Sequence, residues 1–229
     1  MALRKISHVS EADHRIVTDA VAEAERGTDG EIVTIIAAQS DGYDDVALVW
    51  ASVGAFVAMS LVALFPACYQ GLYQTLTGGW GAEPTANQWL GIVLAFGALK
   101  WIGIWIILLW RPLRLALTPR AIKAGRARAR AIDLFKVGTE AKTVGRTGVV
   151  LYVSLKEHRA DIVADEAIAA KVAPEVWGEA MAALIERIRA GQPGEGMAEA
   201  VRQMGVVLAE HFPKSDNNPN ELCDRLIEI

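Results

Sequence analysis

Two long apolar runs dominate the pattern of hydrophobic and polar positions along the chain. Residues 46–67 include no charged side chain, and Ser52 and Ser60 are their polar members. Residues 89–110 carry one charge, Lys100. Each run is long enough for the roughly 20 residues that cross the hydrocarbon core of a membrane. Because a buried helix of a soluble protein is rarely apolar on every face, the pattern predicts a hairpin of two membrane-spanning helices.

Amphipathic helices and short buried strands flank the two runs. Before them, Ser10 is the expected N-cap of a helix that ends at Gly27, and residues 31–37 (EIVTIIA) indicate a strand. After them we expect a helix over 118–137, strands over 148–155 and 159–164 joined by a tight turn, helices over 174–190 and 196–212, and a short helical turn at the end of the chain. One strand before the spans and two after them predict an α/β fold, in which helices flank a small central sheet.

The spans therefore interrupt a folded domain. We expect residues 1–45 to form its N-terminal part, residues 46–110 to form the transmembrane hairpin, and residues 111–229 to form a basic juxtamembrane helix and the remainder of the domain. An even number of spans returns the chain to the side of the membrane on which it began. Both parts of the domain can then meet in one sheet.

Positive charge is distributed unevenly around the spans. The loop over 68–88 has no Lys or Arg, and its single acid is Glu83. Basic residues follow the second span closely: Arg111, Arg114, Arg120, Lys123, Arg126, Arg128 and Arg130. The positive-inside rule places this segment, and with it both termini, in the cytoplasm. We expect Arg111, Arg114, Arg120, Lys123 and Arg126 to lie at the membrane surface, where anionic lipid headgroups attract such residues.

Lys100 is a candidate functional residue, because it lies near the middle of the second span. A lysine near the middle of a span marks a functional site unless a thinned bilayer, a shifted span or an oligomer contact accommodates it. Small residues such as Ala51 and Ala55, or Gly54 and Ala58, favour helix packing, which would support a homo-oligomer through the transmembrane helices. Two cysteines are too few for a disulfide framework. No aromatic stacking platform accompanies the basic residues, so nucleic acid is not an expected partner.

Several short motifs resemble the TPM domain family, which includes thylakoid-lumen phosphatase-like and photosystem-repair proteins. The similar stretches are residues 28–33, 147–151, 154–159 and 165–168, Trp177, the turn over 191–196, Ala200, Phe212-Pro213 and Asn220-Glu221-Leu222. The last two resemble a bacterial membrane-associated branch, which implies a multi-pass protein of the bacterial inner membrane. The resemblance also implies an α/β sandwich and, for some members, weak acid phosphatase activity and calcium binding by loop acids.

An acidic cluster is the candidate metal site. Asp41, Asp44 and Asp45 follow the first strand, and Asp165 follows the third. Carboxylate oxygens in this number suit a divalent cation such as calcium. The alternative is that these acids are solvated charges in a turn and at helix N-termini.

From these observations we expect a membrane protein with a cytoplasmic TPM-like domain. The domain is interpreted as a non-catalytic module that binds a protein partner or a metal ion near the bilayer. The alternative is a weak metal-dependent acid phosphatase, which requires Asp41, Asp44, Asp45 and Asp165 to converge on one metal ion.

Overall fold

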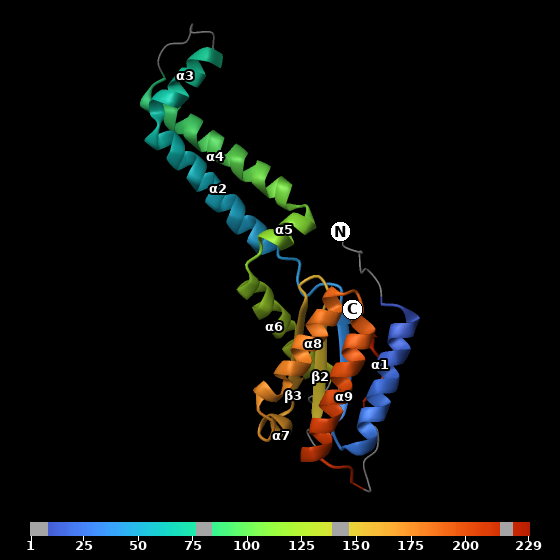
Figure 1. Ribbon diagram of the computed structural model, residues 1–229. Coiled ribbons are helices and arrows are strands. Elements are labelled where there is room, and N and C mark those ends of the chain that lie inside the picture. The colour runs from blue at the N-terminus through green and yellow to red at the C-terminus, as the bar shows by residue number, and fades with distance from the viewer. Residues whose placement is uncertain (1–8, 77–83, 139–146, 216–221) are drawn as a thin grey trace. The chain divides into compact units, whose positions relative to one another are not determined.

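The chain forms two compact units in the computed structural model, which describes residues 9–76, 84–138, 147–215 and 222–229 (Figure 1). Unit 1 combines Met1–Asp41 with Arg120–Ile229, and unit 2 is Gly42–Pro119. The predicted basic segment is therefore divided between the units at Pro119. Asn220 and Glu221, which contribute to the family resemblance, lie outside the described residues.

Unit 1 is built on a four-stranded sheet in the order β3-β2-β1-β4. The strands are β1 (Glu31–Ala37), β2 (Gly148–Ser154), β3 (Arg159–Ala164) and β4 (Ile227–Glu228). β1 pairs in parallel with both β2 and β4, and β2 pairs antiparallel with β3. The predicted α/β fold is confirmed, with its central sheet formed from segments on both sides of the apolar runs.

Helices cover both faces of this sheet. The helices α1 (Glu11–Ala24), α8 (Gly178–Arg189) and α9 (Pro193–His211) pack on one face, and α6 (Arg120–Gly138) packs on the other. Short segments complete the unit: η1 (Glu25–Gly27), α7 (Glu166–Ala169) and η2 (Pro174–Trp177). Successive strand residues alternate between the two cores, so Ile32 and Ile36 face α9 while Val33 and Ile35 face α6.

The sequence predicts the start of α1 correctly but not the structure at the end of the chain. Ser10 caps α1 as expected, because its hydroxyl accepts a 3.1 Å hydrogen bond from the Asp13 amide. The expected helical turn at the end of the chain is wrong, since that segment is strand β4. The Ile229 amide donates to the Ile36 carbonyl over 3.0 Å, which satisfies part of an edge of β1 that would otherwise lack partners.

Unit 2 contains α2 (Asp44–Leu64), α3 (Pro66–Leu76), α4 (Ala86–Leu108) and α5 (Arg111–Leu117). The helices α2 and α4 have 21 and 23 residues and are long and apolar enough to cross a membrane. Phe56, Leu64 and Leu99 are 68%, 71% and 67% exposed, so both helices present apolar side chains outward rather than to a core. The structure adds α3, where the sequence predicted a loop.

Small residues let α2 and α4 pack closely. Ala51 and Ala55 are buried, and a side chain at Gly54 would collide with Ile104 of α4. The indole Nε1 of Trp101 donates a 3.2 Å hydrogen bond to the Ser52 hydroxyl across the pair. The small residues thus serve helix packing within the hairpin.

The close approach of α1 and α9 generates a stability prediction. A Cβ atom at Gly205 would lie 2.6 Å from Ala24 Cβ and 3.0 Å from Ala24 Cα. We expect Gly205→Ala to destabilise unit 1 by about 1–3 kcal/mol, because overpacking outweighs the better helix propensity of alanine. Native-state hydrogen exchange of the β1 and β2 amides in the full chain measures this loss.

Gly125→Ala is the matched control. Gly125 lies within α6, and a Cβ atom there meets nothing within 4 Å. Its substitution should leave stability unchanged or raise it by up to about 1 kcal/mol. Equal stability of the Gly205→Ala variant and the wild type would contradict the packing argument.

Candidate functional site

The structure does not bring the four predicted metal ligands together. Asp165 lies beside the start of β2, where its Oδ2 accepts a 3.2 Å hydrogen bond from the Gly148 amide. Asp41 follows the far end of β1, where its Oδ2 lies 2.9 Å from a guanidinium nitrogen of Arg126. Seven strand residues separate these positions, about 20 Å at roughly 3.3 Å per residue. One metal ion cannot bind to both Asp41 and Asp165.

The other two predicted ligands belong to unit 2. Asp44 and Asp45 occupy the first turn of α2, and the carboxylate of Asp44 pairs with the guanidinium of Arg114 on α5. Arg114 is 5% exposed, so it stabilises the connection of α2 to α5 rather than presenting its charge outward. Among the residues that the structure describes, no three His, Cys, Asp or Glu side chains are close enough to hold a metal ion.

The other basic residues that we expect at the membrane surface are divided between the two units, and Lys100 lies in unit 2. Arg111 lies on α5, and Arg120, Lys123 and Arg126 lie on α6 in unit 1. Lys100 is exposed on α4, and its Nζ lies 5.0 Å from the centroid of the Phe96 ring, one helical turn earlier. This cation–π contact partly compensates the lysine charge.

A buried polar cluster fastens the β2–β3 turn to the end of β1. The Glu157 carboxylate accepts hydrogen bonds from the Ser154 hydroxyl and, over 2.9 Å, from the Ser40 amide. The hydroxyl oxygens of Ser40 and Tyr152 lie 3.0 Å apart. Burial raises the pKa of Tyr152, and the Glu157 charge adds to this effect. Because its hydrogen-bonding groups satisfy one another, we interpret this cluster as an anchor of the turn.

The outer edge of β3 is the first candidate binding surface. No other strand among the described residues pairs with that side of β3. The Asp165 amide donates to the Gly148 carbonyl, and hydrogen-bonded pairs alternate along an antiparallel ladder. Ala160, Ile162 and Ala164 therefore direct their backbone N–H and C=O groups away from β2. This edge has the hydrogen-bonding pattern that a further strand requires.

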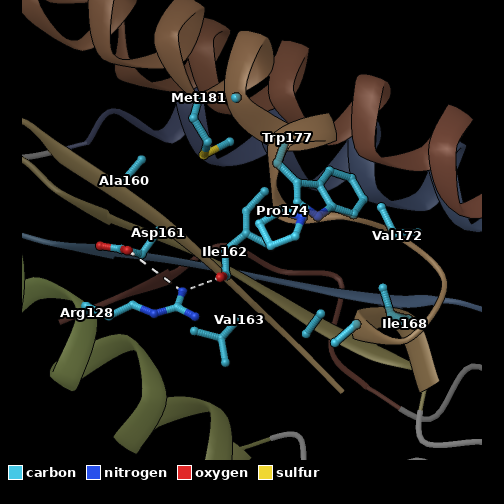
Figure 2. Close-up of a pocket in the computed structure, with 13 residues that line it drawn as sticks. Arg128, Ala160, Asp161, Ile162, Val163, Ile168, Val172, Pro174, Trp177 and Met181 are labelled. Atoms are coloured by element: carbon cyan, nitrogen blue, oxygen red, sulfur yellow. Dashed lines mark hydrogen bonds and ion pairs between the residues drawn. The ribbon is translucent and has the colours of Figure 1, made fainter. Parts of the chain in front are cut away.

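An apolar groove of about 360 Å³ runs beside this edge. Its floor is β3, and its wall is the segment from α7 to the first turns of α8, as Figure 2 shows. The lining residues are Arg128, Ala160, Asp161, Ile162, Val163, Ala164, Ile168, Ala169, Val172, Pro174, Trp177, Gly178 and Met181. The volume suits one or two apolar side chains of a ligand.

Arg128 of α6 reaches the same edge from the opposite face of the sheet. Its guanidinium donates to the Ile162 carbonyl and lies 3.8 Å from the Asp161 carboxylate (Figure 2). It thus occupies one of the outward carbonyl groups of β3. Burial raises the pKa of Asp161, and the nearby Arg128 and Arg159 oppose this rise.

Glu25 is a buried carboxyl group that the sequence analysis did not single out. Its Oε1 accepts a 2.8 Å hydrogen bond from the Ile32 amide at the start of β1. Burial raises the pKa of Glu25 from 4.5 to about 8; the bond from Ile32 opposes this shift, and the Glu31 charge adds to it. Glu25 therefore carries a proton at neutral pH in the folded state.

Comparison with known proteins shows the fold and no more. No family model matches the chain, and no curated protein matches it. The NMR structure of the BA42 protein from the psychrophilic bacterium Bizionia argentinensis is similar, with a TM-score of 0.55 and 15% sequence identity over 99% of each chain. The chain thus belongs to the class of mixed α/β proteins with a four-stranded sheet, and it carries two helices long enough to span a membrane.

The Glu25 carboxyl group makes stability depend on pH. The unfolded chain releases this proton near pH 4.5 and the folded chain near pH 8, so stability falls as pH rises between these values. We expect Glu25→Gln, which keeps an acceptor for the Ile32 amide, to remove this fall. Its advantage over the wild type should grow to a few kcal/mol at pH 8, at about 1.4 kcal/mol per pKa unit.

Denaturant titrations of the full chain at pH 5, 6.5 and 8 measure this difference. Glu23→Gln, an exposed position on α1, is the control and should show no such trend. A Glu25→Gln advantage that is the same at all three values would contradict the assignment.

Proposed function

We propose that this protein is a multi-pass protein of the bacterial inner membrane whose TPM-like domain lies in the cytoplasm and binds a partner protein. The domain is non-catalytic, and it accepts an extended segment of the partner as an additional strand along β3. The unpaired outer edge of β3, with an apolar groove beside it, is the observation that carries this proposal.

The membrane anchor is supported by the outward faces of α2 and α4. Exposed apolar side chains cover both helices, as a lipid environment requires. Basic residues follow α4 and extend from Arg111 on α5 to Arg130 on α6, whereas residues 68–88 have no Lys or Arg. This asymmetry supports a cytoplasmic position for unit 1.

Strand addition is supported by the geometry of the groove. The outward backbone groups of β3 provide main-chain hydrogen bonds, and the groove beside them accepts an apolar side chain of the added strand. Metal-dependent acid phosphatase activity, the alternative that the family resemblance implies, has no comparable support. The carboxylates of Asp41 and Asp44 are already paired with Arg126 and Arg114.

The two cysteines test the topology. Both are exposed, Cys68 on α3 and Cys223 in unit 1. We expect a membrane-impermeant maleimide to modify Cys68 and not Cys223 in intact spheroplasts, and to modify both after permeabilisation. Mass spectrometry of the two peptides measures this. Modification of Cys223 alone would reverse the topology, and modification of both in intact spheroplasts would contradict a spanning hairpin.

Peptide binding tests the groove. Peptides selected from a random extended library on the full chain in nanodiscs should bind in the micromolar range. They should slow hydrogen exchange at Ile162 and Ala164. Met181→Glu places a charge in the groove and should weaken binding at least tenfold, because an apolar peptide side chain would then face a buried carboxylate.

Val206→Glu is the matched control. Val206 is an exposed apolar residue on α9 that does not line the groove, so its substitution should leave peptide affinity unchanged. Selected peptides that protect amides elsewhere, or that bind the Met181→Glu variant equally well, would contradict strand addition along β3.

A further inference from the structure

A second hollow of unit 1, of about 770 Å³, lies at the β2–β3 turn. Three parts of the chain that are distant in sequence form it: the first turn of α6, the turn between β2 and β3 with the start of β3, and α8 from Met181 to Arg189. It shares Ala160 and Met181 with the β3 groove, but its character is different. The charged residues that line it are Arg120, Lys123, Lys156, Glu157, Arg159, Glu186 and Arg189.

The charge in this basic pocket is unbalanced. Five of its lining residues are Lys or Arg and two are Glu. Of the two acids, Glu157 already accepts hydrogen bonds from Ser154 and Ser40 in the buried cluster that holds the turn. The pocket therefore concentrates positive charge that its own acids do not neutralise.

Four of these basic side chains lie outside the ion pairs of the described residues. Arg120, Lys123, Arg159 and Arg189 form no hydrogen bond and no ion pair there. Neighbours on the same helices behave differently. Arg126 pairs with Asp41, and Arg187 lies 3.3 Å from the Glu195 carboxylate. The pocket thus brings together four basic side chains that no ion pair of the described residues holds.

His158 lies among these charges. Its φ of 50° places it in the left-handed region within the turn, and the residue lines the pocket. Burial lowers the pKa of His158, and the positive charges of Arg189 and Lys123 lower it further, while Glu157 opposes them. The imidazole therefore senses the positive potential of the pocket and reports any anion that reduces it.

The pocket lies at the end of unit 1 where the chain leaves this unit and returns to it. The chain leaves unit 1 after Asp41, beyond the end of β1, and returns to it at Arg120, which lines the pocket. The β2–β3 turn lies at the same end of the sheet, because Ser154 pairs with Ala37. Both connections to the apolar helices thus leave from the end of unit 1 that holds the pocket.

We propose that this basic pocket binds a phosphate group, carried by a phospholipid headgroup or by a small soluble phosphate. Guanidinium groups recognise phosphate oxygens through paired charge-assisted hydrogen bonds, and Arg159 and Arg189 supply two of them from different elements. The hollow is larger than one phosphate ion needs, which leaves room for the ester substituent. The proposal is independent of peptide binding along β3.

His158 resonances in the full chain provide the test. The protein is held in dodecyl maltoside, inorganic phosphate is titrated in, and sodium chloride keeps the ionic strength constant. The His158 signals are assigned with His158→Gln. We expect a saturable shift and a raised pKa of His158. The double variant Arg159→Gln/Arg189→Gln should weaken the apparent affinity at least tenfold, whereas Arg187→Gln, whose partner is Glu195, should leave it unchanged.

A second experiment tests whether the phosphate group belongs to a lipid headgroup. The same signals are compared in nanodiscs of phosphatidylcholine and of anionic phosphatidylglycerol. A shift in phosphatidylglycerol that the double variant loses, with no effect of inorganic phosphate, assigns the pocket to a lipid headgroup. A saturable effect of inorganic phosphate assigns it to a soluble phosphate. No specific effect in either arm, or an effect that the double variant retains, would overturn the proposal.

Discussion

The parallel ladder between β1 and β2 joins parts of the chain that residues 38–147 separate in sequence. Seven residue pairs form it, and every residue of both strands is buried. Neither strand could leave its backbone groups unpaired in such a core, so unit 1 requires segments from both sides of the apolar helices in one sheet.

The strand order then decides which surfaces remain for binding. β4 takes the outer side of β1, so the edge of the sheet next to β2 is left to β3. Helix α6 covers one face of that edge, and η2 with α8 covers the other, and the apolar groove lies between β3 and the second group. Arg128 limits the exposed part of the edge by occupying the Ile162 carbonyl. Charged side chains commonly protect edge strands from pairing with other chains. Here the groove beside Arg128 remains accessible.

The elements that the sequence predicted are those with a strong local signal. The apolar runs gave α2 and α4 within three residues of their starts, and the runs EIVTIIA and GVVLYVSL gave β1 and β2. Ser10 was identified from its cap chemistry alone. These signals depend on neighbours in sequence, which is why a single chain reveals them.

Features that depend on distant partners were not predictable in this way. Ile227 and Glu228 form a strand because β1 offers them an edge, and two residues alone carry no strand signal. The groove depends on the strand order, and the raised pKa of Glu25 depends on burial beneath the start of β1. For the acidic cluster, the sequence shows the charges of Asp41 and Asp44, but it does not show that Arg126 and Arg114 form ion pairs with them.

Of these ion pairs, the one between Asp41 and Arg126 lies in unit 1, at the end of the sheet where we propose that an anion binds. A carboxylate held 2.9 Å from a guanidinium, as Asp41 is by Arg126, has lost much of its attraction for a cation, since the pair is nearly neutral at a distance. At the β2–β3 turn the acid Glu157 is hydrogen-bonded to Ser40 and Ser154, and Arg159, Arg189 and Lys123 form no ion pair with it. The same distribution of acids that argues against a calcium site therefore leaves a pocket that attracts negative charge.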